Sequence, residues 1–156
     1  MPILKKRLKQ KAAVKDSILC AARTIVLKEG WQAVSIRKIA EIIGYSLPVV
    51  YKHFESKDAI LEEFVKQGFE LLSELMLNTK AKETTAEKQL TAMALAYFDF
   101  AFSKREYYQM MFGLGMPTCE RVNQINEIGK FSSIVVNTIQ NLINEEELNE
   151  KIILKF

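Results

Sequence analysis

The chain has 156 residues, 49% of them hydrophobic, so it can bury a substantial core and is not a disordered tail. No apolar run reaches the roughly 20 residues that a membrane-spanning helix needs, and the N-terminus lacks the apolar core of a signal peptide, so we expect a cytoplasmic protein. The formal net charge of +3 is unevenly distributed. Residues 1–58 carry 12 Lys and Arg against 5 Asp and Glu, whereas residues 59–156 carry 10 Lys and Arg against 14 Asp and Glu. This asymmetry favours a nucleic-acid partner for the first part.

The first fifteen residues contain only basic charges. They are Lys5, Lys6, Arg7, Lys9, Lys11 and Lys15, with no acidic residue among them. Repulsion between these charges predicts a loose segment that becomes ordered when a polyanion neutralises it. Such a segment is typical of a DNA-binding arm, and a solubilising tail is the alternative.

Two helices with clear start and stop signals follow. From about residue 14 to 29, apolar residues repeat on one helix face, and Gly30 follows as a C-terminal stop. Ser35 can cap a second, short helix, whose apolar residues fall at positions i, i+3, i+4 and i+7 before Gly44 ends it. Further helices with periods of 3.6 residues follow, and few prolines or glycines interrupt them, so the pattern predicts an all-α fold.

A third short helix begins directly after a tight glycine turn. Ser46 can cap it, Pro48 fits its first turn because proline lacks the N–H that would be unpaired there, and the helix runs to about His53. Two short helices joined by only residues 44–46 predict a helix-turn-helix, whose second helix enters the major groove of DNA.

The second part of the chain predicts four more helices. Ser56 can cap a long fourth helix that links the two parts, and the polar stretch from Asn78 to Thr85 interrupts the pattern and is a candidate boundary. The remaining helices are predicted at about residues 86–102, 105–112 and 119–143.

The stretch from Val34 to Leu61, VSIRKIAEIIGYSLPVVYKHFESKDAIL, contains a short helix, a glycine turn, a Tyr-x-His-Phe pattern and a Ser-Lys-Asp that opens the next helix. This stretch strongly resembles the N-terminal signature of the TetR family of bacterial transcription regulators, and Gly30 with Trp31 at the end of the preceding helix also fits. The resemblance implies a dimeric repressor that binds DNA through a helix-turn-helix and responds to a ligand.

The resemblance assigns base contacts to the second and third helices. Arg37 is similar in position to the family's base-reading arginine, and a guanidinium can pair with guanine O6 and N7. Leu47, Pro48 and Val49 begin the recognition helix, where the family often has polar residues, and their apolar groups suit thymine methyls. For Arg37 the alternative is a solvated surface arginine.

Phosphate contacts are predicted around the end of the recognition helix. Tyr51 and His53 stand where the family places such contacts, and Lys57 lies at the N-terminus of the fourth helix, where an anion is favoured. For Tyr51 the alternative is a half-buried packing aromatic, and for His53 it is a structural hydrogen bond. The predicted DNA-binding residues are Ser35, Arg37, Ser46, Leu47, Pro48, Val49, Tyr51, Lys52, His53 and Lys57, while Phe54 is assigned to the core.

A second resemblance concerns the ligand. The stretch from Ala96 to Gly113, AYFDFAFSKREYYQMMFG, looks like a C-terminal module common in the family, whose members usually bind a small molecule among these helices. Aromatic and methionine side chains can form an adaptable apolar pocket, although at helical spacing they also form ordinary core. The candidate ligand-binding residues are Phe98, Tyr107, Tyr108, Met111, Phe112 and Met116.

Nothing in the sequence predicts catalysis, a metal or a cofactor. Cys20 and Cys119 form no CxxC pattern, the chain has one histidine, and neither a paired-carboxylate site nor a phosphate-binding glycine loop is present. We therefore expect no enzyme.

The expected organisation has two parts, a basic arm with a helix-turn-helix DNA-binding domain at residues 1–58 and a helical ligand-binding and dimerisation domain at residues 59–156. The expected partners are a palindromic operator in double-stranded DNA, a second copy of the chain and a small hydrophobic effector. The alternative is a helical ligand sensor or protein adaptor that does not bind DNA. The family generally continues with two further helices that form its dimer interface. In this chain the acidic stretch at residues 144–150, followed by apolar residues, resembles the beginning of a helix. We therefore expect the second domain to be incomplete.

Overall fold

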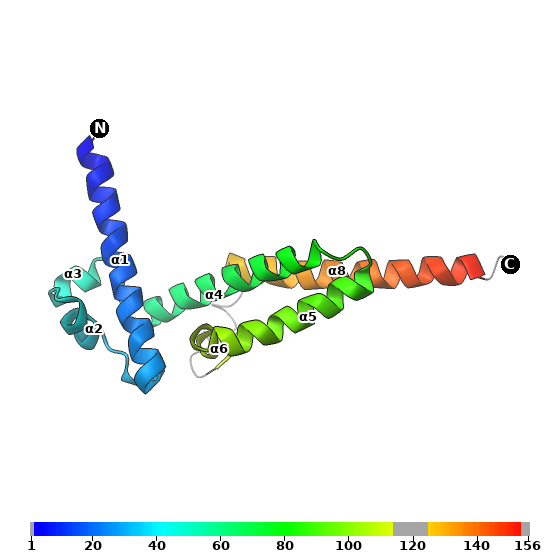
Figure 1. Cartoon of the computed structure of the whole chain (residues 1–156). Helices are drawn as coiled ribbons and strands as arrows, with labels where there is room; N and C mark the ends of the chain where they lie inside the picture. The colour runs from blue at the N-terminus through cyan, green and yellow to red at the C-terminus, as the bar shows by residue number, and fades with distance from the viewer. Residues whose placement is uncertain (1, 114–124, 154–156) are drawn as a thin grey trace.

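The computed structural model describes residues 2–113 and 125–153, and the side chains within 4–113 and 125–147. Throughout these ranges the elements are helices, with no strand, which confirms the predicted all-α fold. A head formed by α1 and the short α2 and α3 lies at one end, and the long helices α4, α5 and α8 extend away from it side by side, with α6 near the junction (Figure 1). We call α4, α5, α6 and α8 the body. None of the described helices is long and apolar enough to cross a membrane.

The basic segment at the N-terminus is helical, so the prediction of a loose arm is wrong. Helix α1 spans Pro2–Glu29 without interruption. Leucine, lysine, arginine and glutamine dominate residues 4–11, and these residues favour the helix, while Pro2 stands at the first position, where proline is tolerated. Side chains 4–13 are all exposed, so solvent screens the repulsion that the prediction relied on.

The short helices of the head begin directly after the predicted serines, but only α2 has both its predicted cap and its predicted end, since the Ser46 hydroxyl makes no capping hydrogen bond to α3. Helix α2 spans Ile36–Ile43; the Ser35 hydroxyl accepts a hydrogen bond from the Lys38 backbone N–H at 3.2 Å, and Gly44 ends the helix with a left-handed φ of 68°. A 3₁₀ turn, η1, spans Trp31–Ala33 between α1 and α2. Helix α3 spans Leu47–Tyr51 and therefore ends two residues before the predicted His53, because the chain turns there and buries Phe54.

The core of the head is built from one face of each helix. Ile18, Ala22 and Ile25 of α1 meet Ile39 of α2 and Val50 of α3 in one buried cluster. Each of these side chains is almost completely removed from water, which is the main favourable contribution to the stability of a small helical unit. The recognition helix is thus anchored through Val50.

Three long helices form most of the body. Helix α4 spans Lys57–Lys80 and is capped by Ser56, whose hydroxyl accepts from the Ala59 N–H at 3.1 Å. Helix α5 spans Ala86–Ser103 and α6 spans Arg105–Phe112, close to their predicted bounds. The predicted break at residues 78–85 begins only after Lys80, because residues 78–80 complete the last turn of α4.

The last helix differs most from its prediction. Helix α8 spans Asn126–Ile153, and the predicted start at Cys119 lies outside the described residues. Residues 144–150, expected to begin a new helix, instead continue α8, because no glycine or proline follows Gly129 to interrupt it. The acidic stretch does cap a helix, but a different one, since the Glu145 carboxylate accepts from the Ala86 N–H at 3.1 Å at the start of α5.

Candidate nucleic-acid interface

Helix α3 presents most of its side chains to solvent. Leu47 is 36% exposed and Tyr51 is 53% exposed, and Ser46, Pro48 and Lys52 are also exposed. Val49 is half-buried, whereas Val50 is fully buried and holds the helix to the head. Every predicted contact residue of α3 except Val49 is therefore open to a ligand as large as a DNA duplex. The exposure of Tyr51 disfavours its alternative interpretation as a packing aromatic.

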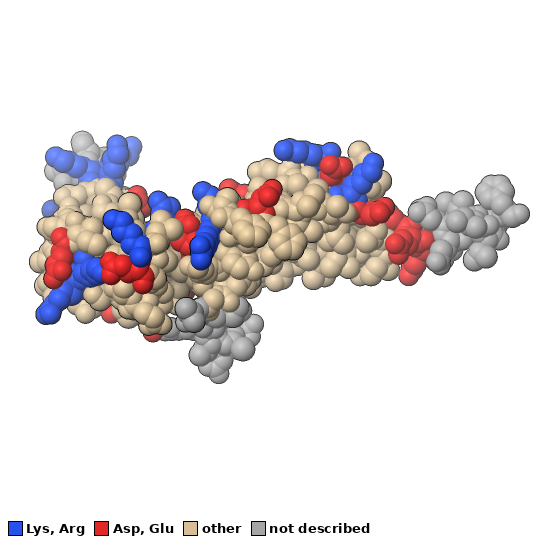
Figure 2. All heavy atoms as spheres, turned by 60° about the horizontal axis from the view of Figure 1, so that its bottom comes forward, with Lys and Arg blue, Asp and Glu red and all other residues tan. Residues whose placement is uncertain are grey.

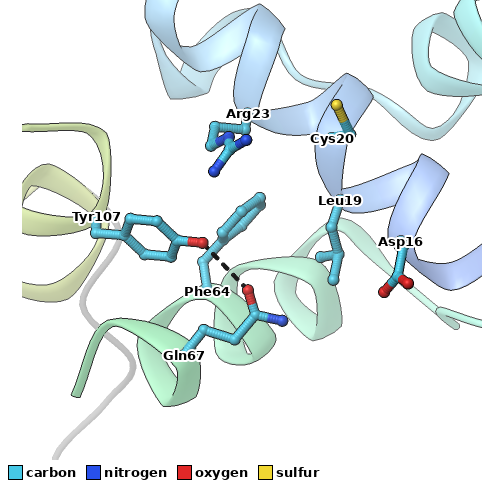
Figure 3. A pocket seen from close by; sticks show the side chains of 7 residues that line it. All are labelled: Asp16, Leu19, Cys20, Arg23, Phe64, Gln67 and Tyr107. Carbon is cyan, nitrogen blue, oxygen red and sulfur yellow. Dashed lines mark hydrogen bonds between the residues drawn. The ribbon is translucent and has the colours of Figure 1, made fainter. Parts of the chain in front are cut away.

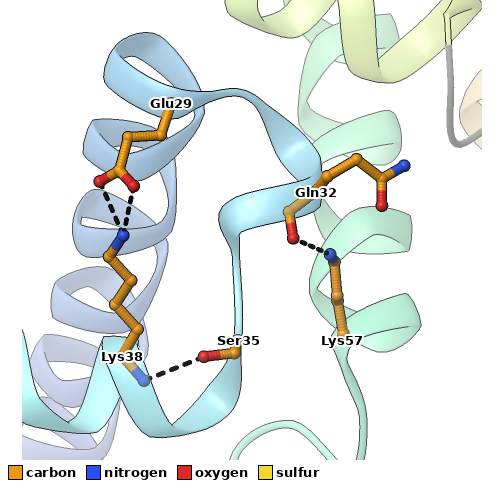
Figure 4. A network of polar contacts seen from close by, with 5 residues as sticks. All are labelled: Glu29, Gln32, Ser35, Lys38 and Lys57. Atoms are coloured by element: carbon orange, nitrogen blue, oxygen red, sulfur yellow. Dashed lines mark hydrogen bonds and ion pairs between the residues drawn. The ribbon is translucent and has the colours of Figure 1, made fainter.

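The basic residues at the start of α2 differ in how they are paired. The Lys38 Nζ lies 2.6 and 2.7 Å from the two carboxylate oxygens of Glu29, so that this charge is neutralised within the head (Figure 4). The neighbouring Arg37 is exposed, and among the described residues it makes no ion pair. Ser35 is exposed as well, but its hydroxyl is already engaged as the cap of α2. Arg37 is therefore the cation of α2 that is available for a base.

Lys57 is held at the junction of α4 with η1. Its Nζ lies 3.4 Å from the Gln32 carbonyl oxygen (Figure 4). The same Nζ lies 4.9 Å from the centre of the Trp31 ring. Burial lowers the pKa of Lys57 from its usual value, and the nearby Asp58 opposes that shift. The ammonium thus stands at the N-terminus of a long helix, as predicted, but the sequence did not reveal its contact with Trp31. The adjacent Gly30 and Trp31 were noted only as a family feature.

His53 faces the basic side of α1. Burial lowers its pKa from the usual 6.5, and the charges of Lys11 and Lys15 lower the pKa further. The Lys15 Nζ also lies 5.9 Å from the centre of the Phe54 ring, and Phe54 is buried as predicted. Within the described part of the chain the His53 side chain has no hydrogen-bond partner, so its structural alternative finds no support there. Figure 2 shows Lys and Arg side chains gathered over the head, with acidic ones among them.

The predicted ligand-binding residues are distributed over three environments. Tyr107 and Met111 are buried against α4, where the Tyr107 hydroxyl donates to Gln67 at 3.3 Å. Phe98 lies on the outer side of α5 and is 59% exposed. Met116 lies outside the described residues.

Tyr108 and Phe112 belong to a separate aromatic cluster on α5 and α6. Their ring centres are 5.0 Å apart, and they lie 5.9 Å and 6.1 Å, respectively, from the ring centre of Tyr97. The Tyr97 and Tyr108 hydroxyls are 3.3 Å apart, and burial together with this hydrogen bond raises the pKa of Tyr97 to about 12. The cluster is packed and half-buried, so it forms core at least in part.

Two hollows lie where the head meets the body. A polar one of about 170 Å³ is bordered by Asp16 and Arg23 of α1, Gln67 of α4 and Tyr107 of α6 (Figure 3). A larger one of about 380 Å³ lies between the end of α1, η1, α4 and α6. Of the predicted ligand-binding residues that the structure describes, only Tyr107 borders either hollow. In the described residues there is no group of three His, Cys, Asp or Glu that could hold a metal ion.

The chain is similar to known regulators over most of its length. The family model described as bacterial regulatory proteins, tetR family, matches residues 18–73. The biofilm operon icaADBC HTH-type negative transcriptional regulator IcaR of Staphylococcus aureus (strain Newman) is 26% identical over 129 residues, which are 83% of this chain and 63% of IcaR. The HTH-type transcriptional activator FasR of Mycolicibacterium smegmatis is 26% identical over 98 residues, 63% of this chain and 45% of FasR. The chain thus spans less than two thirds of the length of these relatives.

Solved structures share the fold. A regulatory protein of the tetR family from Rhodococcus RHA1 superimposes with a TM-score of 0.69 at 17% identity, covering 85% of this chain and 70% of that one. A TetR-family regulator from Bordetella parapertussis 12822 gives a TM-score of 0.64 at 18% identity, covering 89% and 73%. The solved structures show a shared fold, and the family match together with the two relatives favours a DNA-binding regulator over the adaptor that binds no DNA.

Proposed function

Because this chain belongs to the TetR family of bacterial transcription regulators, which are DNA-binding proteins and not enzymes, we propose that it is a repressor that binds a palindromic operator as a homodimer and is released by a small hydrophobic effector. The observation that carries the proposal is the arrangement of α3, which is anchored by Val50 and turns Leu47, Pro48 and Tyr51 to solvent. Residues 1–58 supply DNA binding, and residues 59–156 supply the effector and dimer contacts.

On the operator, the two copies of α3 lie in successive major grooves, about 34–36 Å apart. Arg37 pairs with a guanine, and Leu47, Pro48 and Val49 contact thymine methyls. The remaining predicted contacts go to the phosphate backbone and fix the position of α3, and they come from Ser35, Ser46, Tyr51, Lys52, His53 and Lys57. The exposed basic side chains of α1 follow the adjacent backbone.

Repression is the mode proposed because a bound dimer blocks a promoter without any partner other than DNA. Of the two relatives, IcaR is described as a negative regulator and FasR as an activator, and IcaR shares the longer alignment with this chain. An effector that prefers one orientation of the two heads would shift the dimer toward it by the difference in its affinity for the two states.

The dimer contact is assigned to the outer face of α8. Val136, Ile139 and Ile143 are exposed there at spacings of three and four residues, whereas Thr138 on the opposite face is buried. A continuous apolar stripe on a helix is the usual seam of a helical dimer. Light scattering on the purified chain should give a dimer, and Ile139→Glu should give monomers, while the matched change Asn137→Glu beside the stripe should leave the dimer intact.

A gel-shift titration with DNA from the chain's own promoter region and with random DNA of equal length tests operator binding. Arg37→Ala should cost about 1–3 kcal/mol on the operator and relax the preference at one base pair. Lys57→Ala should weaken binding to both DNAs alike and reduce the slope of affinity against salt by about one. Equal affinity of the unchanged protein for operator and random DNA would refute a sequence-specific repressor.

A further inference from the structure

The larger hollow between head and body has the size and lining of a ligand pocket. Its volume of about 380 Å³ lies within the range of roughly 300–1,000 Å³ that small-molecule pockets occupy. Val26 of α1, Leu61 of α4 and Met110 of α6 form apolar walls, and Trp31 of η1 closes one side. These three aliphatic walls are themselves buried residues of the chain's core.

The rim of the hollow is open at one glycine. Gly30 and Gly113 both border it, and a Cβ added to Gly30 would meet no atom within 4 Å, whereas a Cβ added to Gly113 would overlap the Gln109 backbone. Beside them the exposed Gln109 brings one amide to the edge. An occupant is therefore apolar over most of its surface and carries a single hydrogen-bonding group, which Gln109 can meet.

One wall of this hollow also holds a predicted phosphate contact. The Trp31 ring that borders the hollow lies 4.9 Å from the Lys57 Nζ, which also donates to the Gln32 carbonyl oxygen at 3.4 Å. In this arrangement the ammonium is directed to η1, where burial lowers its pKa. The conformation in which the hollow is open is therefore also the one in which Lys57 contacts Trp31.

We propose that this hollow is an effector site for a small, largely apolar molecule, and that its occupant weakens operator binding by keeping Lys57 on Trp31 and Gln32. An occupant stabilises the conformation that contains the hollow, so it competes with a DNA phosphate for the ammonium. The proposal rests on the proposed function for its effect on DNA. It differs from the division into two domains in one respect, because Val26, Gly30 and Trp31 of residues 1–58 share the effector contacts with residues of 59–156.

Trp31 allows a direct test, because it is the only tryptophan in the chain. The full chain is titrated with N-phenyl-1-naphthylamine, a neutral apolar probe, while Trp31 emission and probe emission are recorded. We expect saturable binding of one probe per chain with quenching of Trp31. Leu61→Phe, which fills the hollow, should weaken probe binding about tenfold or more, whereas the matched change Leu95→Phe on the exposed side of α5 should leave it unchanged.

Gln109→Lys is a second variant for the case that Leu61→Phe does not fold. It alters only an exposed rim residue, and the added charge should weaken binding of the neutral probe. Circular dichroism establishes which variants are folded. Equal probe affinity in both folded variants and the unchanged chain, or probe binding without quenching of Trp31, would overturn the site.

The link to DNA is tested by repeating the operator titration with saturating probe. Operator affinity of the unchanged chain should fall about tenfold and its salt slope by about one, while Lys57→Ala should not respond further to the probe. Probe binding with no loss of operator affinity would overturn the regulatory part. A chain that binds no operator without probe would refute the proposed function instead, and the fluorescence titration would still decide on the hollow.

Discussion

The outer faces of α3 and α5 both present large apolar side chains to water, but in different electrostatic settings. Leu47 and Tyr51 on α3 precede Lys52 in the chain, and the same head carries the exposed Arg37 of α2, which makes no ion pair among the described residues. On α5 the exposed stripe is Leu95, Phe98 and Phe102, the last 83% exposed, with Asp99 beside it. Exposed apolar residues indicate a contact surface on both helices. The positive charge near α3 favours a polyanion, whereas α5 has no Lys or Arg within its stripe at residues 95–102 and suits an uncharged partner.

A new negative charge separates these two surfaces most sharply. Leu47→Glu should weaken operator binding about 100-fold, since the carboxylate would stand against DNA phosphates. Because Leu47 is exposed, its free energy of unfolding should change by less than about 0.5 kcal/mol. The matched change Phe98→Glu should leave operator affinity unaltered. Gel shifts and thermal melts measure both quantities, and similar losses of DNA binding in the two variants would remove the distinction between the faces.

The body differs from the head in depending on close helix packing. Gly68 of α4 faces α6, and an added Cβ would lie 2.8 Å from the Met111 Cγ and overlap its sulfur. Met111 is fully buried, so its side chain has little room to move. Gly68→Ala should lower the free energy of unfolding by about 1–2 kcal/mol, the overlap outweighing the better helix propensity of alanine.

Gly129 of α8 supplies the control for this substitution. A Cβ there would meet nothing within 4 Å, so Gly129→Ala should raise the free energy of unfolding by about 0.5–1 kcal/mol. Urea titrations compare the two variants. Stabilisation by Gly68→Ala would mean that α6 does not lie this close to α4 in solution.

Within the head, two serines that precede helices should differ in their contribution to stability. The Ser35 hydroxyl accepts from the Lys38 N–H at 3.2 Å, whereas the Ser46 hydroxyl makes no capping bond. Ser35→Ala should therefore cost about 1 kcal/mol of unfolding free energy, and Ser46→Ala less than about 0.5 kcal/mol. Urea titrations of both variants check the order, and a larger loss for Ser46→Ala would contradict the capping pattern.

The head was predictable from sequence because its short helices are delimited by local signals. Ser35, Gly44 and Ser56 act within one turn of their own positions, so no distant contact is needed to locate them. The two long helices were predicted less well. Both α1 and α8 extend through charged stretches whose charge pattern predicts a loose arm and a new helix start. In both places helix propensity outweighs charge repulsion and the capping signal.

The candidate ligand residues show what the sequence pattern left undecided. Phe100 shares its helix face with Met93 and Ala96 at spacings of three and four residues and is buried, whereas Phe98 lies two positions away and is exposed. That spacing could have separated the two phenylalanines in advance. That Trp31 and Met110 border the same hollow could not be predicted from the sequence, because their proximity depends on how α6 packs against α1.

The smallest predicted effect concerns pH and separates the two interpretations of His53. It is the only histidine in the chain, so a change between pH 5.5 and 7 is assigned to it. Because folding lowers its pKa below 6.5, its neutral form stabilises the native state fully above pH 6.5, and this contribution is lost as the pH falls through the lowered value. His53→Gln should therefore flatten the loss of unfolding free energy on acidification.

DNA binding should show the opposite sign. If His53 contacts a phosphate, the bound state favours the charged imidazolium, so complex formation takes up a proton and operator affinity rises as the pH is lowered from 7.5 to 6. That rise should be absent in His53→Gln. Equal pH dependence of operator affinity in both proteins would assign His53 to the packing of α1 against the end of α3, where burial and then the charges of Lys11 and Lys15 lower its pKa, with no contact to DNA.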